Sequence, residues 1–254
     1  MRVSVLTGGI LAAALVLASP AGAQRGPGEE AGAEERFAPV GLVLNPTAYT
    51  LPAGRWLIGA GTFQQAVVTG DSDRQYSAGI FYGISDNLYV GGFWTGVQRD
   101  RPDGSDIVES YFGGLAQYKL ISETAGSLVP SFSIGGYAYT GPGDGGTLYA
   151  VASKNLMGSV RPGAVFLHAG ARWDTFNNDG LDDDAIRPFV GANLLVTREL
   201  ALNWEWRQRH FGETNNLWAA GAIWLINNRY ALSAGVQDPG SGSTQFYAGL
   251  SIVP

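Results

Sequence analysis

Cysteine is absent from the 254-residue sequence. This absence excludes disulfide bonds, thiol catalysis and cysteine-ligated metal sites, so the fold must be stabilised without covalent cross-links. Charged residues are also scarce, at 15% of the chain, against about 25% in ordinary soluble domains. The net charge of −6 disfavours a nucleic-acid partner, because such a surface needs a basic face. No phosphate loop or dinucleotide fingerprint occurs, so no cofactor is expected.

Long hydrophobic runs are missing as well. Outside the N-terminus, no apolar run approaches the roughly 18 residues that a membrane helix needs. At the N-terminus, Arg2 precedes an apolar run too short for a stop-transfer segment, and small residues lead up to Ala23. This pattern predicts a signal peptide at residues 1–23, cleaved before Gln24, and therefore export. Residues 24–36 contain no large apolar side chain, which predicts a disordered leader.

Glycine is abundant, with 37 residues, and aromatic residues make up 11% of the chain. An exported, charge-poor chain without membrane helices suggests a membrane β-barrel, which closes every backbone hydrogen bond within its sheet. Residues 37–54 are apolar but broken by three prolines, so a central strand is not expected there. We predict a periplasmic segment at 37–54 that packs against or into the mouth of a barrel formed by residues 55–254.

From Arg55 onward, segments of about ten residues alternate with turn residues, a length that suits membrane strands. The pattern predicts an all-β, up-and-down antiparallel transmembrane β-barrel of about twelve strands. The expected strands are Arg55–Val68, Gln75–Gly83, Asn87–Gln98, Ile107–Ile121, Leu128–Thr140, Thr147–Leu156, Gly163–Phe176, Ile186–Thr197, Leu200–His210, Asn216–Ile226, Tyr230–Gln237 and Thr244–Val253. Tight connections such as 84–86 and 227–229 alternate with longer acidic ones such as 99–106. This alternation predicts periplasmic termini and long external loops.

The two faces of the expected strands differ in polarity. Leu202, Trp204 and Trp206 share one face of their strand, because side chains alternate with a period of two. Asn203, Glu205, Arg207 and Arg209 share the other face. In a soluble sandwich the tryptophans would form the core, whereas in a membrane barrel they face lipid and the charges face the lumen. The recurrence of such faces on consecutive strands favours the barrel over a soluble periplasmic β-sandwich.

The polar face defines a predicted lumen network. Because buried ions persist only when partnered, we expect paired charges that pack the lumen or line a polar pore. The predicted network consists of Glu109, Lys119, Lys154, His168, Arg172, Asp174, Arg187, Glu205, Arg207 and Arg209. Aromatic residues near strand ends are expected in interfacial girdles. They are Trp56, Tyr82, Tyr89, Tyr139, Trp173, Tyr230 and Tyr247.

The two histidines limit the catalytic options. His168 lies in mid-strand on the polar face, where a hydrogen-bond network is a better interpretation than a catalytic base. His210 lies at the outer end of its strand, and the nearby hydroxyl is Thr214. A barrel-rim lipid hydrolase, which needs a nucleophile within reach of such a histidine, remains an alternative. No catalytic residue is assigned.

The acidic stretch 174–184 places Asn177, Asp179 and Asp183 at alternating positions around Gly180, a pattern that partly resembles a calcium loop. Thr175 stands where the first Asp of such a loop would be, and no Glu closes the ligand set. We therefore predict a solvated acidic loop and no metal site.

Three phrases together resemble a known family. They are Asn45-Pro-Thr-Ala-Tyr-Thr-Leu-Pro-Ala-Gly-Arg-Trp, Tyr82-Gly-Ile-Ser-Asp-Asn-Leu-Tyr-Val-Gly and Tyr149-Ala-Val-Ala-Ser-Lys-Asn-Leu. The pattern is similar to that of YjbH-type outer-membrane barrels, which are associated with exopolysaccharide production, and of related small barrels. The resemblance spans Asn45 to the C-terminus. It implies a location in the outer membrane and a role in polymer export.

The sequence thus predicts a non-enzymatic barrel of the bacterial outer membrane, acting as a small pore or as a structural, envelope-associated component. The expected partners are outer-membrane lipid, lipopolysaccharide, the barrel assembly machinery and, through the resemblance, polysaccharide. The lipid hydrolase and the soluble periplasmic binding sandwich are the alternatives.

Overall fold

The computed structural model describes residues 42–65, 73–100, 106–124, 126–178, 181–209, 215–227, 229–238, 240 and 244–252. The predicted signal peptide, the predicted leader and the first residues of the 37–54 segment lie outside the described residues, as does His210. No helix in the described part of the chain is long and apolar enough to cross a membrane.

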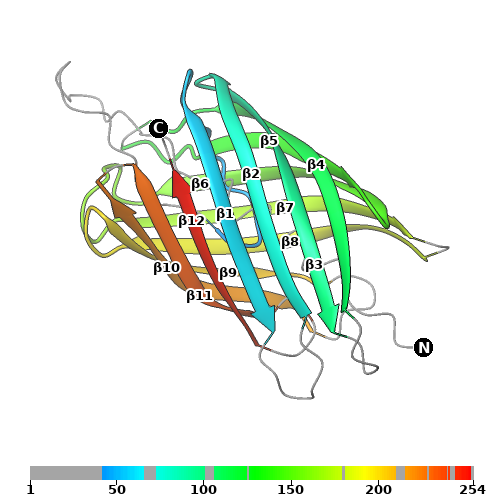
Figure 1. The fold of residues 1–254 in the computed structure, drawn as a ribbon. Coiled ribbons are helices and arrows are strands. Elements are labelled where there is room, and N and C mark those ends of the chain that lie inside the picture. The colour runs from blue at the N-terminus through cyan, green and yellow to red at the C-terminus, as the bar shows by residue number, and fades with distance from the viewer. Residues whose placement is uncertain are drawn as a thin grey trace.

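Twelve antiparallel strands form a closed barrel in which each strand pairs with its neighbours in the sequence and β1 pairs with β12 (Figure 1). The strands are β1 (Trp56–Gln65), β2 (Asp73–Ser85), β3 (Leu88–Asp100), β4 (Asp106–Ile121), β5 (Ser131–Thr140), β6 (Asp144–Asn155), β7 (Val165–Asn178), β8 (Leu181–Leu195), β9 (Leu200–Arg207), β10 (Leu217–Ile226), β11 (Tyr230–Asp238) and β12 (Gln245–Ile252). The predicted up-and-down topology and the strand number are confirmed.

The largest boundary difference concerns β8. This strand begins at Leu181 rather than at the expected Ile186, because the acidic stretch continues the ladder with β7 up to the pair Asn178↔Leu181. Asn177 and Asp183 are therefore strand residues, and Asp179 and Gly180 lie outside the described residues. The backbone in this region is a β-hairpin rather than the predicted loop.

The lengths of the connections are less asymmetric than predicted. The turns after β2, β8 and β10 are short, as expected. The connections after β4 and β6, residues 122–130 and 156–164, are longer, although they lie at the same end of the barrel. Which end faces the periplasm therefore stays a prediction.

Side chains alternate between the two sides of the wall as predicted. On β9, Leu202 and Trp204 point outward and are 46% and 49% exposed, whereas Asn203, Glu205 and Arg207 are buried inside the barrel. The same parity runs through β10 and β8, since Trp204 pairs with Ala220 and Ala192 in register. Strand β9 thus turns its charged side chains into the barrel and its apolar side chains outward.

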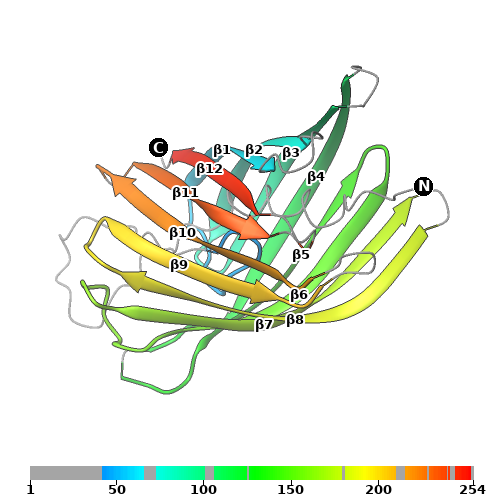
Figure 2. The same cartoon turned by 90° about the horizontal axis from the view of Figure 1, so that it is seen from below.

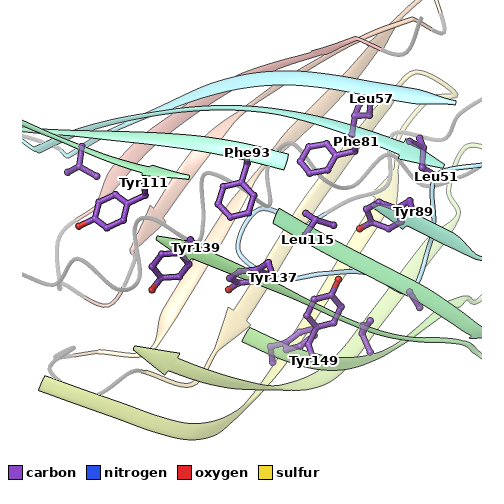
Figure 3. Close-up of a cluster of buried hydrophobic side chains, with 14 of the residues drawn as sticks. Leu51, Leu57, Phe81, Tyr89, Phe93, Tyr111, Leu115, Tyr137, Tyr139 and Tyr149 are labelled. Carbon is purple, nitrogen blue, oxygen red and sulfur yellow. The ribbon is translucent and has the colours of Figure 1, made fainter. Parts of the chain in front are cut away.

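Three of the expected girdle aromatics face the lumen instead, so that prediction was wrong for Tyr89, Tyr139 and Tyr247, all buried. Tyr89 and Tyr139 join an inner aromatic cluster on β2–β6 (Figure 3). Tyr247 lies against Gly221 and Gly235, where the missing side chains leave room for its ring. Parity, rather than nearness to a strand end, decides which side an aromatic side chain takes. Trp56, Trp173 and Tyr230 are exposed on the outside, as expected.

Candidate functional site: the plugged lumen

The lumen is occupied by the segment that precedes β1. Residues 42–51 are all buried, and we call residues 42–52 the plug. Figure 2 shows this segment, in blue, looping inside the ring of strands before it enters β1. The sequence led us to expect a segment that packs against or into the barrel mouth, and the structure places its described part within the barrel.

Prolines explain why the plug does not become a strand. Pro46 and Pro52 have no backbone N–H, so neither can donate to a ladder. The remaining backbone groups of the plug still need partners, because an unpaired buried N–H or C=O costs about as much as a lost hydrogen bond. Inward-facing side chains of the barrel provide those partners.

Glu205 on β9 binds the inner end of the plug. Its carboxylate accepts hydrogen bonds from the backbone N–H of Val43 and of Leu44, the latter at 2.8 Å. It also accepts one from the Asn45 side-chain Nδ2, at 2.9 Å. Three donors from one short segment thus converge on one fully buried carboxylate.

Gln117 on β4 binds the middle of the plug. Its Nε2 donates to the carbonyl oxygens of Thr47 and Tyr49, each at 3.0 Å. The amide is oriented by the hydroxyl of Tyr149, which donates to Gln117 Oε1 at 2.9 Å. Tyr89 donates to the same oxygen at 3.3 Å. The inner aromatic cluster therefore positions a polar side chain that holds the plug.

A chain of polar groups runs from the plug through β5, β6, β7 and β8. Ser133 donates to the Ala48 carbonyl oxygen, and the Ala48 N–H donates to Ser153 Oγ, both at 2.8 Å. Ser153 Oγ lies 2.8 Å from His168 Nδ1, and His168 Nε2 lies 2.8 Å from Asn193 Oδ1. Because Asn193 Oδ1 can only accept, Nε2 carries the histidine proton and Ser153 donates to Nδ1.

This serine, histidine and asparagine arrangement resembles a nucleophile and its base. Ser153 and His168 are 1% and 2% exposed, and the plug backbone covers the hydroxyl. The plug therefore leaves a substrate no approach to the Ser153 hydroxyl.

Arg172 on β7 links the plug to the remaining charges. Its Nε donates to both oxygens of Asp174, at 2.7 and 3.0 Å. Its Nη1 donates to the Leu44 carbonyl oxygen at 3.3 Å, and its Nη2 donates to the Tyr137 hydroxyl. Arg187 on β8 shares Asp174, with Nη1 3.6 Å from Oδ2. One carboxylate thus serves two guanidinium groups beside the plug.

Two glycines give the plug its steric room. A Cβ atom on Gly83 of β2 would lie 2.7 Å from the Leu51 carbonyl oxygen and collide with the Pro52 backbone. A Cβ atom on Gly191 of β8 would lie 2.7 Å from Leu42 Cδ1. Both ends of the plug therefore pack closely against the inner face of the barrel, and the positions of Gly83 and Gly191 have no room for a larger side chain.

The ten residues of the predicted lumen network differ in burial and in the side of the wall that they face. Six are buried inside the barrel: His168, Arg172, Asp174, Arg187, Glu205 and Arg207. Glu109 and Lys119 occupy inward positions on β4 and are partly buried. Lys154 has outward parity and lies 3.6 Å from Glu123 at the barrel end, and Arg209 is exposed beyond the end of β9. The structure brings Arg172, Asp174 and Arg187 together and separates Lys154 from them.

Sequence reasoning missed the plug contacts made by Gln117, Ser133 and Ser153, and the contact of Asn193 with His168. Their inward parity was the available signal, since small polar residues on a lumen face need partners. Among the described residues, no group of three or more histidine or acidic side chains could hold a metal ion. Thr214, the hydroxyl considered for His210, lies with it outside the described residues.

Comparisons with known proteins show the fold. No family model and no curated protein matches the chain. Among solved structures, the KdgM porin matches with a TM-score of 0.57 at 10% identity, over 77% of this chain and 98% of that one. KdgM in complex with disordered oligogalacturonate matches with a TM-score of 0.54 at 8% identity, over 76% and 98% of the two chains. The COG4313 outer membrane channel from Pseudomonas putida F1 matches with a TM-score of 0.52 at 12% identity, over 81% and 97%. The chain thus has the fold of small outer-membrane barrels, and the YjbH-type resemblance stays a prediction.

Proposed function

We propose that this protein is a non-enzymatic barrel of the bacterial outer membrane that acts as a small channel, which the plug closes in the present conformation. The observation that carries the proposal is the polarity of the closed wall. Large apolar side chains are exposed on the outside of eleven of the twelve strands, and the interior of β7–β9 holds buried charges. Soluble proteins usually bury apolar side chains and expose charged ones. The opposite arrangement seen here suits a wall between lipid and an aqueous lumen.

The exterior supports the membrane location. Outward side chains that are at least 40% exposed include Trp56, Ile80, Phe112, Ile134, Leu148, Leu167, Ile186, Trp204, Trp224, Leu232 and Phe246. Soluble monomers rarely expose large apolar side chains on so many neighbouring strands. Trp56 stacks on Tyr82 with ring centroids 4.5 Å apart near one end of the barrel, a position typical of an interfacial girdle. Outer-membrane lipid, lipopolysaccharide and the barrel assembly machinery are the partners that this placement entails.

The interior supports a polar, acidic solute. Arg172, Arg187 and Arg207 lie on the adjacent strands β7, β8 and β9, and all three are at most 2% exposed. The oligogalacturonate named with KdgM is an acidic carbohydrate, and guanidinium groups bind carboxylates with two parallel hydrogen bonds. We therefore extend the proposal to the passage of acidic saccharides, which includes the polymer export implied by the sequence resemblance.

The test combines localisation with conductance. We expect the protein in outer-membrane fractions, with a faster gel mobility before boiling than after it, because the closed barrel resists detergent. A variant in which a Gly/Ser stretch of equal length replaces residues 42–51 should give stepwise conductance in planar bilayers. A protein found in the soluble periplasm would overturn the membrane location. A correctly folded, plug-replaced barrel that conducts nothing would overturn the channel.

A further inference from the structure

The plug is held by hydrogen bonds from side chains, whereas each strand is held by backbone hydrogen bonds to its neighbours. All twelve strands have both neighbours in the barrel, so the closed ladder offers no edge to the plug. The plug backbone is bound instead by side chains, namely those of Gln117, Ser133, Ser153, Arg172 and Glu205. Departure of the plug would therefore break none of the hydrogen bonds that close the barrel.

The two ends of the plug are attached in different ways. At the β1 end, the Gly54 N–H donates to the Gly83 carbonyl oxygen at 2.8 Å. Thr50 Oγ1 donates to the Asp86 carbonyl oxygen at 2.7 Å, and the Ala53 N–H donates to Asp86 Oδ1 at 3.1 Å. These contacts tie residues 50–54 to the end of β2 and to the turn between β2 and β3, directly before the chain enters β1. This end is a fixed attachment.

At the opposite end, the hydrogen bonds converge on few groups. Glu205 receives the three donors of Val43, Leu44 and Asn45, and Arg172 donates to the Leu44 carbonyl oxygen. Because three of these four hydrogen bonds end on one carboxyl group, Glu205 contributes most to the polar binding of residues 43–45. This end is a latch that depends on one carboxylate.

The polar side chains of the lumen could also remain exposed to water without the plug. The plug covers the polar side chains of Glu205, Arg172, Gln117, Ser133 and Ser153, together with apolar side chains of the inner wall. In an open lumen, water can hydrogen-bond to each of these polar side chains, so they need not be left without a partner. The buried apolar plug residues Val43 and Leu44 pack against Phe63, Leu217 and Tyr247, and this contact opposes opening. Water can thus replace the hydrogen bonds that hold the plug.

We propose that the plug is a removable gate, latched at Glu205 and hinged at residues 50–54, and that the inner wall of β4–β9 is a binding site for this polypeptide segment. The pore that it opens rests on the proposed function, but the movement itself does not. The two can therefore be tested separately.

The first test follows the movement of the plug without reference to conductance. Because the chain has no cysteine, Ala48→Cys introduces a single thiol in the middle of the plug. We expect a small maleimide reagent to label this thiol slowly in the folded barrel and at least tenfold faster when Glu205→Gln is added. Glu109→Gln is the matched control, since Glu109 is also a carboxylate on the lumen face and accepts a hydrogen bond from Tyr111 on its own strand. Its labelling rate should equal that of Ala48→Cys alone.

The mobility of unheated protein confirms in each case that the barrel is folded, and labelling in denaturant confirms that the thiol is reactive. Equal labelling rates in the Glu205→Gln and Glu109→Gln backgrounds would overturn the latch. So would a thiol that stays unlabelled in both folded variants.

The second test links the gate to the pore. A disulfide between Ala48→Cys and Ser153→Cys, whose parent residues are hydrogen-bonded, should abolish the conductance steps of the Glu205→Gln barrel, and reduction should restore them. Faster labelling without conductance in any variant would retain the gate and overturn the channel. Equal conductance in the oxidised and reduced barrels would retain the channel and overturn the gate.

Discussion

Single residues inside a closed barrel must find partners across long sequence separations, and Glu205 shows how. A carboxylate on the lumen face of β9 cannot remain without donors, because an uncompensated buried charge is costly. Its donors come from the plug, 162 positions away from it in the case of Val43. Parity along β9 predicts that Glu205 points inward, but it carries no information about so distant a partner. The direction of this side chain was therefore predictable, whereas its role was not.

Gly83 provides a steric prediction at this scale. Gly83→Ala places a Cβ atom against the Leu51 and Pro52 backbone, which cannot give way as a flexible side chain would. We expect a loss of about 1–3 kcal/mol in stability and a lower temperature for the gel-mobility shift. Gly92→Ala is the control, because its Cβ atom would meet only the Gly113 carbonyl oxygen, at 3.7 Å. Equal transition temperatures for the two variants would contradict the close packing of the plug against Gly83.

Asp174 provides an electrostatic prediction. Asp174→Asn removes the carboxylate that Arg172 and Arg187 share, leaving two buried guanidinium groups without it. Breaking a buried pair on one side costs about 3–5 kcal/mol, so denaturant should unfold this variant at a clearly lower concentration. Glu199→Gln, in the exposed turn between β8 and β9, should leave the midpoint unchanged. An unchanged midpoint for Asp174→Asn would show that the shared carboxylate adds nothing to the fold.

At the scale of elements, the strands were predictable and the plug was only partly so. A period of two is a local property, so the alternation of Leu202 to Arg207 identifies both a strand and its faces. The start of β8 was missed because acidic residues look like a loop, although the register with β7 continues to Leu181. The apolar, proline-broken character of the plug indicated a segment that is neither strand nor solvated loop. Its path through the lumen depends on hydrogen bonds from side chains on five strands, β4, β5, β6, β7 and β9, and on apolar contacts with others, which no local pattern encodes.

Trp204 tests which side of β9 meets lipid. Trp204→Arg places a charge on the outward face, which costs about 2–4 kcal/mol near the bilayer midplane. We expect a reduced yield of folded barrel in lipid vesicles and a lower unfolding midpoint. Trp204→Phe retains an apolar outward side chain and should fold as the parent does. If the arginine variant folded equally well in lipid, the exterior of β9 would not face the hydrocarbon.

At the scale of the whole molecule, the lumen has two unlike walls with the plug between them. Aromatic and aliphatic side chains cover the inside of β2–β6, where Tyr89, Tyr137 and Tyr149 lie (Figure 3). Buried charges cover the inside of β7–β9. The plug meets both, through Gln117 on the aromatic side and Glu205 on the charged side. Closure of the barrel creates this arrangement, because it brings strands that are distant in sequence to face each other.

The charged wall predicts how an open lumen discriminates between ions. Inward positions of β7–β9 carry three arginines, Arg172, Arg187 and Arg207, against the two carboxylates of Asp174 and Glu205. Fixed positive charge in a low-dielectric wall attracts anions and repels cations. In the plug-replaced barrel, we therefore expect a reversal potential in a KCl gradient that indicates preference for chloride. Arg207→Gln should shift it toward zero by removing one of the three positive charges, whereas Arg198→Gln, in an exposed turn, should not. A cation-preferring parent, or equal shifts from both variants, would mean that the arginines of β7–β9 do not set the field along the path of the solute.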